Sequence, residues 1–323
     1  MNRSSAIGGP IAAEAAPLRF PWSTLAILRD LVALLKLRIT ALVIVTSVGG
    51  MWLAARLGAA PAPSLATAGV TLVGLCMVVG AANALNMYLE RDSDALMART
   101  KNRPLPAGRL QPVVALWLAW GLSVVALPLL AFVNMPTALL AAWAFALYAG
   151  FYTPFKRVTH HALLIGAVPG ALPPLIGWTA VTGEIGLGGL LLFGVLFFWQ
   201  VPHFLAIATL FADDYANAGL KVMPKTEPPR VVRVHALVHG VLLLVVSLGL
   251  VGSLGPRGGL GLGYGLSALL LGGAFLAVIA GDPGEEAEVT RRRRWARRVF
   301  FFSLIYLTAL FAVIGVTGML VTT

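Results

Sequence analysis

The sequence predicts an all-α integral membrane protein, with nine transmembrane helices around a central cavity and a cytoplasmic N-terminus. Of its 323 residues, 59% are hydrophobic and only 11% are charged, against about 25% charged residues in an ordinary soluble domain. The apolar residues fall in long runs, and a run of about 18 or more is typical of a membrane span. The Lys and Arg residues gather on one side of these runs, which predicts the orientation.

Nine apolar runs are long enough to cross a bilayer. Backbone groups in lipid must be satisfied within the chain, so each run is expected to form a helix. Pro169, Pro173 and Pro174 are tolerated in such a helix and are expected to kink the fifth one. The expected spans are 37–56, 65–89, 112–133, 136–153, 162–182, 187–208, 233–253, 260–280 and 299–320.

The connections between the spans alternate between charged and charge-poor segments. Of the 24 Lys and Arg residues, only Arg56 and Arg257 lie on the charge-poor side. This asymmetry places the N-terminus and the charged loops in the cytoplasm. Residues 1–24 are expected to form a flexible cytoplasmic tail and residues 25–323 a single polytopic domain. Membrane orientation and contact with the lipid bilayer therefore account for the net charge of +11, and no nucleic-acid partner is expected.

A ladder of polar side chains marks the cytoplasmic end of the second span. Asn86, Glu90 and Asp94 are spaced four residues apart, so they share one face of a helix that turns about 100° per residue. Hard oxygen ligands one turn apart can hold Mg²⁺ while leaving coordination positions open for substrate phosphates. A solvated helix end is the alternative, but it explains poorly a ladder that begins inside an apolar helix, where polar groups are costly.

Basic residues follow this ladder directly, in segment 99–109. Lys and Arg are the expected complement of a diphosphate beside a metal, although orientation alone would also explain them. A second acidic cluster, Asp213 and Asp214, follows the sixth span on the same side of the membrane. With only 13 acidic residues in the chain, the two clusters indicate two metal-binding halves that face one cavity.

His203 lies inside the sixth span, about ten residues before Asp213. A histidine within a span is a functional candidate by default. It is interpreted here as a haem ligand, a general base or a satisfied polar group at a helix interface. The other histidines lie nearer the water interface, where solvation explains them.

These segments together resemble the UbiA superfamily of membrane prenyltransferases, from about residue 25 to the end of the chain. The ladder followed by RTKNRPLPAGR at 99–109 carries the resemblance. The segments YTPFKRVT at 152–159, GALPPLIGW at 170–178 and PHF at 202–204, with DDY at 213–215, narrow it to the branch that farnesylates haem. The resemblance implies transfer of a farnesyl group from farnesyl diphosphate to a vinyl group of haem B, with addition of water, giving haem O and diphosphate.

The resemblance also implies roles for individual residues, with Mg²⁺ as cofactor and haem B as substrate. Asn86, Glu90, Asp94 and Asp213 are the expected metal ligands, and Asp214 completes the expected catalytic set. The resemblance does not settle which residue ligates the haem iron, and His203 is the expected haem-binding residue because it lies inside a span. The residues expected to hold the diphosphate are Arg99, Lys101, Arg103 and Lys156.

Two positions depart from the superfamily pattern. Glu90 stands where an Asp is more common, and Asn217 occupies the later acidic position of the second motif, which leaves the presence of a second Mg²⁺ open.

Two other interpretations of the function also remain: a related enzyme that prenylates an aromatic acid or a chlorin-like ring, and a transporter without chemistry. The expected location is a bacterial inner membrane with the active site toward the cytoplasm. A hand-over of haem O to a downstream haem-modifying enzyme or terminal oxidase assembly is a further expectation.

Overall fold

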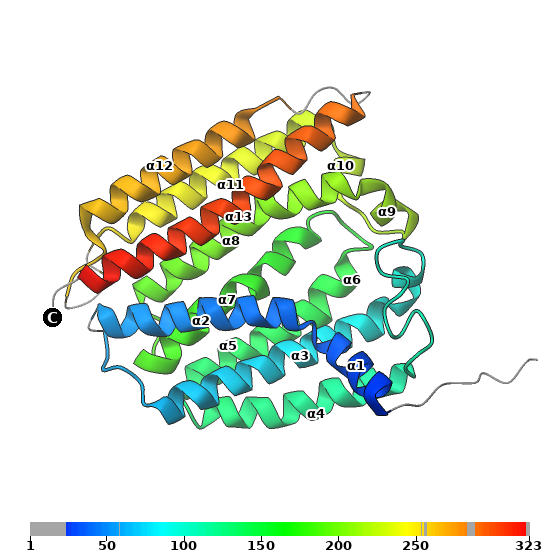
Figure 1. The fold of residues 1–323 in the computed structure, drawn as a ribbon, viewed down its shortest axis with the longest axis horizontal. Coiled ribbons are helices and arrows are strands. Elements are labelled where there is room, and N and C mark those ends of the chain that lie inside the picture. The colour runs from blue at the N-terminus through cyan, green and yellow to red at the C-terminus, as the bar shows by residue number, and fades with distance from the viewer. Residues whose placement is uncertain (1–23, 58, 253, 255–256, 283–287, 321–323) are drawn as a thin grey trace, which may run out of the picture.

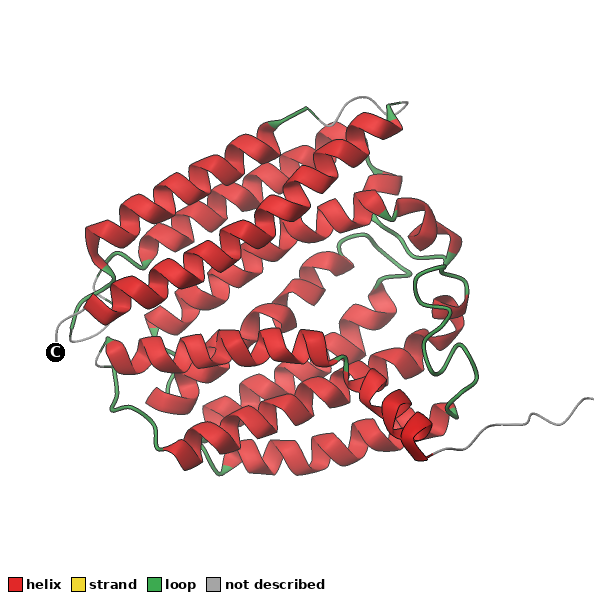
Figure 2. Cartoon of the chain, in the orientation of Figure 1, coloured by secondary structure: helices red, strands yellow, loops and turns green. Residues whose placement is uncertain are grey.

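The computed structural model describes residues 24–320, apart from 58, 253, 255–256 and 283–287. All regular structure in these described residues is helical (Figure 2). Nine of the helical segments are long and apolar enough to cross a membrane, which confirms the predicted fold class and number of spans. The spans are α2 (Leu37–Arg56), α3 (Leu65–Ala95), α4 (Pro112–Ala131), the continuous segment Met135–Phe155, α7 (Ala162–Thr182), α8 (Leu187–Leu210), α11 (Pro229–Gly249), α12 (Gly261–Ala280) and α13 (Val289–Leu320).

The spans form two groups that meet at the centre of the molecule (Figure 1). In the first group, α3 packs along α4, and α7 packs against both α2 and α5 (Met135–Ala146). In the second group, α8 packs against α11 and α13, and α12 lies against both of these helices. Contacts between α7 and α8 join the two groups. The central helix α7 is the most buried span, so its prolines lie among protein neighbours.

Small residues set the close approach of α2 and α7. A Cβ atom at Gly50 of α2 would overlap the carbonyl group of Pro174, and a Cβ atom at Gly177 of α7 would overlap the carbonyl group of Ser47. Both obstructions are backbone atoms, which cannot rotate away as a side chain would. Small residues at this crossing let the two helix backbones touch, which is a common way to pack helices in membranes.

Several elements differ from the sequence-based expectation. Helix α3 continues six residues beyond the predicted end of the second span, so the whole polar ladder is helical. Helix α13 begins at Val289 and carries the arginine-rich segment as helix. The predicted tail 1–24 lies outside the described residues except for Thr24, which begins α1 (Thr24–Leu35). Three short elements, α6 (Thr153–Phe155), α9 (Ala212–Asn217) and α10 (Met223–Thr226), gather with α1 at the right-hand end of Figure 1.

A π-helical turn, Leu147–Tyr152, joins α5 to α6. Thr153 donates two hydrogen bonds to Tyr148 O, one from its backbone N–H across the wide turn and one of 2.9 Å from Oγ1. Asn86 Nδ2 in turn donates to Thr153 Oγ1 at 3.1 Å. Single π-helical turns inside α-helices are frequent at functional sites, and this one connects directly to the polar ladder of α3.

Candidate active site

A cavity of about 500 Å³ lies between the two groups of spans. Its inner part is apolar, with walls from α2, α3, α5, α7 and α8. The outer part, toward α9 and α10, is lined by polar and charged side chains. Representative apolar wall residues are Ile39, Val43, Val78, Phe145, Leu163 and Ile207. The cavity therefore offers an apolar chamber with a charged mouth, which suits an amphipathic ligand with an anionic end.

The polar ladder of α3 faces this charged mouth. Asn86, Glu90 and Asp94 all line the cavity and are only 1%, 8% and 1% exposed. Burial of two carboxylates is costly unless each is paired. The structure therefore brings together the three residues that the sequence pattern placed on one helix face.

Each ladder residue accepts a hydrogen bond from a different cation. Lys36 Nζ donates to Asn86 Oδ1 at 3.0 Å. The Lys156 ammonium lies 2.7 Å from Glu90 Oε1, and Arg103 lies 2.6 Å from Asp94 Oδ2. These cations come from three separate segments: the junction of α1 and α2, the loop after α6, and the loop after α3. The tertiary fold, rather than local sequence, assembles the charged mouth.

The ladder has the chemistry of a Mg²⁺ site. Asp94 Oδ1 is buried and has no hydrogen-bond partner among the described residues, so this oxygen is suited to a cation. Within the same residues, no three His, Cys, Asp or Glu side chains lie close enough to hold a metal together. One amide and two carboxylate oxygens instead match a Mg²⁺ ion that keeps other positions for water and phosphate oxygens.

The charged mouth carries more positive than negative charge. Burial, together with the nearby positive charge of Arg103, lowers the pKa of Lys36 to about 7. The acidic side chains that line the cavity are Glu90 and Asp94. The Lys and Arg side chains that line it are Lys36, Arg99, Arg103, Lys156 and Lys221. Even with Lys36 neutral, four basic side chains face two carboxylates, and this excess favours an anionic ligand.

Aromatic side chains of the π-helical turn flank Lys156. The Lys156 ammonium lies 4.1 Å from the centre of the Tyr152 ring, and the Tyr148 and Tyr152 rings are 5.6 Å apart. Both tyrosines line the cavity where its charged and apolar parts meet. Their electron-rich faces can stabilise a positive charge that develops there.

Hydrogen bonds join the loop after α3 to α9 beside the cavity mouth. The backbone N–H of Ala98 donates to Asp214 Oδ1 at 3.0 Å. Arg99 donates to the Tyr215 hydroxyl at 3.1 Å, and its guanidinium lies over the rings of Phe211 and Tyr215. Arg99 therefore lines the cavity but contacts α9 rather than the ladder.

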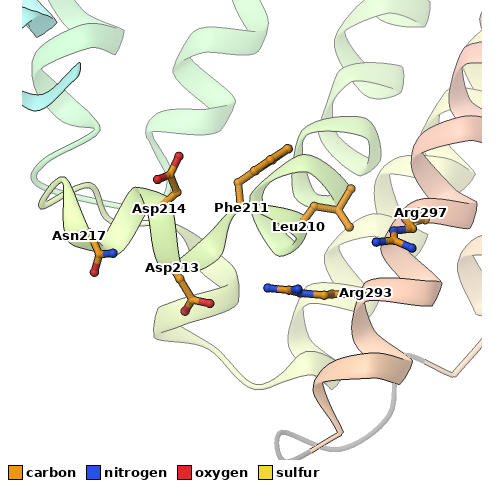
Figure 3. Close-up of a pocket in the computed structure, with 7 residues that line it drawn as sticks. All are labelled: Leu210, Phe211, Asp213, Asp214, Asn217, Arg293 and Arg297. Atoms are coloured by element: carbon orange, nitrogen blue, oxygen red, sulfur yellow. The ribbon is translucent and has the colours of Figure 1, made fainter. Parts of the chain in front are cut away.

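The structure does not bring Asp213 and Asp214 into the cavity, contrary to the expectation of two metal-binding halves. Together with Asn217 they line a separate surface hollow opposite Arg293 and Arg297 of α13 (Figure 3). The Asp213 side chain is 71% exposed and pairs with Lys225 at 2.6 Å, and this hydrogen bond holds the pKa of Asp213 below its usual value.

Helical geometry explains this outcome. Helix α8 ends at Leu210 and α9 begins at Ala212, so the relevant faces are those of α9 itself. Asp213 and Tyr215 are two residues apart on α9, which is a turn of about 200° around the helix, and Tyr215 is the residue of this pair that lines the cavity. Charge favours the acidic residues as site residues, whereas the helix face favours the neighbouring tyrosine.

Two further expected site residues also lie outside the cavity. Lys101 is exposed and is absent from the cavity wall. His203 faces α13, where its Nδ1 atom lies 2.7 Å from Ser303 Oγ and its ring stacks on Trp199 and Phe300. Among the interpretations of His203, this position corresponds to the satisfied polar group at a helix interface.

Several cavity residues were not singled out from the sequence. In the sequence, Lys36 contributes only to the orientation charge, Tyr148 lies in an apolar run, and Tyr152 opens the segment 152–159 that carries the resemblance without a role of its own. The spacing of Tyr148, Tyr152 and Lys156, four residues apart, is a signal that could have identified this face. For Lys221 and His160, which also line the cavity, we find no local pattern that distinguishes them from solvated residues.

Comparison with known proteins assigns the family. Residues 42–305 match the model of the UbiA prenyltransferase family. The chain belongs to this family. It is 47% identical over 289 residues to a protoheme IX farnesyltransferase of Anaeromyxobacter dehalogenans strain 2CP-C, covering 89% of this chain and 93% of that protein. It is 48% identical over 285 residues to the protein of the same name from Sorangium cellulosum strain So ce56, covering 84% and 98%.

Solved structures share the fold, UbiA homologues among them. A digeranylgeranylglyceryl phosphate synthase aligns with a TM-score of 0.73 at 14% identity, over 90% of this chain and 98% of that chain. A UbiA homologue from Archaeoglobus fulgidus bound to GPP and Mg²⁺ aligns with a TM-score of 0.56 at 15% identity, over 88% and 99%. The protein is therefore a multi-pass membrane prenyltransferase with the UbiA fold.

Proposed function

We propose that the protein transfers the farnesyl group of farnesyl diphosphate to a vinyl group of haem B, with addition of water, to give haem O and diphosphate. The observation that carries this proposal is the buried ladder of Asn86, Glu90 and Asp94, with its cations, at the mouth of an apolar chamber. The farnesyltransferase relatives at 47–48% identity support the choice of prenyl donor and acceptor.

We assign the metal site to the ladder alone. Asn86, Glu90 and Asp94 would hold one Mg²⁺. When bound, this ion would neutralise the negative charge on the oxygens of the diphosphate as it leaves. Lys36, Lys156 and Arg103 lie beside these ligands and would bind the remaining phosphate oxygens. The surface position of Asp213 does not support it as a ligand of the same ion.

The chain's other residues would guide the carbon chemistry. The carbon–oxygen bond to the diphosphate breaks, and the allylic cation lies beside the rings of Tyr148 and Tyr152. A carbon–carbon bond then forms to the terminal vinyl carbon, and the resulting cation takes the oxygen of a water molecule while a proton leaves. The apolar wall keeps other water away from the allylic cation.

Product analysis tests the reaction. Purified protein would be incubated with haem B, Mg²⁺ and farnesyl diphosphate. The haems would be separated by chromatography and their masses measured by mass spectrometry. We expect a haem heavier by one farnesyl group plus water, dependent on Mg²⁺. Folded protein that binds farnesyl diphosphate but leaves haem unchanged would contradict the proposed acceptor.

We assign the haem propionates to Arg99 and Lys221, which line the cavity and are not the cations that pair with the ladder. Each propionate would gain a charge-assisted hydrogen bond. Haem B dimethyl ester lacks these charges, so it should be farnesylated about tenfold less efficiently. Equal efficiency for haem and its ester would remove this assignment.

The two acidic residues of α9 should behave differently when replaced. Asp214→Ala removes the acceptor of the Ala98 N–H and should raise KM for farnesyl diphosphate about three- to tenfold, the effect of one lost hydrogen bond. Asp213→Ala removes only an exposed pair and should leave kinetics unchanged. Steady-state assays of both variants check this. A larger loss for Asp213→Ala would restore this residue to the catalytic set.

We place the protein in a bacterial inner membrane with the charged loops and cavity mouth in the cytoplasm, as the distribution of Lys and Arg supports. A cysteine introduced at Arg230 should react with an impermeant reagent in inside-out vesicles only. Reaction in right-side-out vesicles would reverse the orientation. Transfer of haem O to a downstream haem-modifying enzyme or terminal oxidase assembly stays a prediction, which cross-linking in native membranes would test.

A further inference from the structure

Lys36 has an unusual backbone conformation at the junction of α1 and α2. Its φ and ψ angles are 48° and 57°, and it is the sole non-glycine residue with positive φ in the described part of the chain. The left-handed region is unfavourable for L-amino acids with a Cβ atom. Such strain persists where the surrounding structure requires it, often at functional sites.

This junction aims the Lys36 side chain into the cavity. Helix α1 ends at Leu35 and α2 begins at Leu37, so Lys36 alone provides the change of direction. Its Nζ atom reaches Asn86 Oδ1 at 3.0 Å, fifty residues along the chain. The next basic residue, Arg38, is exposed and does not line the cavity. The residue with the strained backbone is therefore the one whose ammonium group lies beside the ladder.

A cation bound to each of the three ladder residues competes with a metal ion at the same place. An ammonium or guanidinium hydrogen-bonded to Asn86, Glu90 or Asp94 repels a divalent ion that uses those oxygens. A diphosphate relieves this conflict, because its oxygens can accept the hydrogen bonds that the ladder gives up. Metal and diphosphate should thus bind together far better than the metal binds alone.

We propose that Lys36 is a diphosphate-binding residue whose ammonium moves from Asn86 Oδ1 to a phosphate oxygen when a divalent metal and the diphosphate bind together. Lys156 and Arg103 make the same exchange from Glu90 and Asp94. The inference rests on the proposed function for the identity of the anion. Its consequence is positive coupling between metal and diphosphate, which by linkage is reciprocal.

A purely structural role for Lys36 predicts a different result. If its ammonium only pinned the helix junction to α3, its removal would weaken both ligands through disorder of the mouth. The exchange instead predicts effects of opposite sign. Loss of the ammonium removes repulsion from the metal that binds alone, but it also removes one hydrogen bond from the diphosphate.

The test uses Mn²⁺ as a paramagnetic substitute for Mg²⁺ and inorganic pyrophosphate as the anion, with the full chain in detergent. Lys36→Asn removes the ammonium while keeping a residue type that tolerates the left-handed conformation. Arg38→Asn is the matched control, with the same loss of charge two residues away. Free Mn²⁺ is measured by electron paramagnetic resonance, and melting curves report the fold.

In Lys36→Asn we expect Mn²⁺ alone to bind at least about threefold more tightly. We expect pyrophosphate in the presence of Mn²⁺ to bind about 10- to 100-fold more weakly. Arg38→Asn should match the wild type in both measurements. Unchanged pyrophosphate affinity, or weaker binding of both ligands, would overturn the exchange. If Lys36→Asn lacks a melting transition, Lys36→Gly repeats the test with an unstrained backbone.

Failure of this inference can be separated from failure of the proposed function. The binding test involves neither haem nor a prenyl chain. Wild-type protein that shows the coupling but makes no farnesylated haem would contradict the proposed reaction alone. Wild-type protein that makes haem O while Lys36→Asn binds pyrophosphate normally would contradict the role of Lys36 alone.

Discussion

Asp94→Asn should lower kcat for haem farnesylation about 1,000-fold or more. The substitution removes the charge of a 1% exposed carboxylate, one of whose oxygens is buried without a partner in the described structure. Loss of a metal ligand and of the charge that positions Arg103 removes stabilisation of the leaving diphosphate. Quench-flow or steady-state product assays with saturating farnesyl diphosphate measure the effect.

Asp92→Asn is the control for this prediction. Asp92 lies two residues earlier on the same helix, but its side chain is 77% exposed and pairs only loosely with Arg91, at 3.7 Å. We expect its activity to stay within about twofold of the wild type, as for most exposed ion pairs. Asp94→Asn that retained a tenth of the wild-type kcat would remove the ladder from the proposed mechanism. Comparable melting temperatures would show that the loss is chemical.

Gly177→Ala should have the largest effect on stability. The added Cβ atom would overlap the Ser47 carbonyl group of α2, and no side-chain rotation can relieve a clash with backbone. Overpacking of this kind lowers the free energy of unfolding by up to about 3 kcal/mol. The melting temperature should therefore fall by about 5–10 °C. Because α2 and α7 both carry cavity walls, farnesyl diphosphate binding should weaken as well.

Gly121→Ala on α4 is the matched substitution. A Cβ atom at Gly121 meets nothing within 4 Å, and alanine favours a helix over glycine. This variant should melt at or slightly above the wild-type temperature in the same detergent. If Gly177→Ala and Gly121→Ala melted alike, the glycine crossing of α2 and α7 would not be the contact that sets their approach.

The limits of sequence-based prediction are clearest at the second acidic cluster. Asp213 and Asp214 have the same charge and lie on the same side of the membrane as the ladder residues, so charge and position predicted a second metal-binding half, and the family resemblance made Asp213 an expected metal ligand. The structure places them on the far face of a short helix, where Asp214 fastens the loop after α3 and Asp213 pairs with Lys225. The rotation of α9 about its axis determines which of its side chains meet the cavity, and the charge of a residue does not indicate this rotation.

Hydropathy and local spacing by themselves determined the nine helical spans and the shared face of Asn86, Glu90 and Asp94. Both are properties of neighbouring residues, because lipid forces each apolar run into a helix and a helix turns by a constant angle per residue. Only the tertiary structure decided that Lys36, Lys156 and Arg103 meet this ladder, and that His203 faces α13 instead of the cavity. Those contacts depend on how helices distant in sequence are rotated and packed, and close backbone approach at residues such as Gly177 sets that packing.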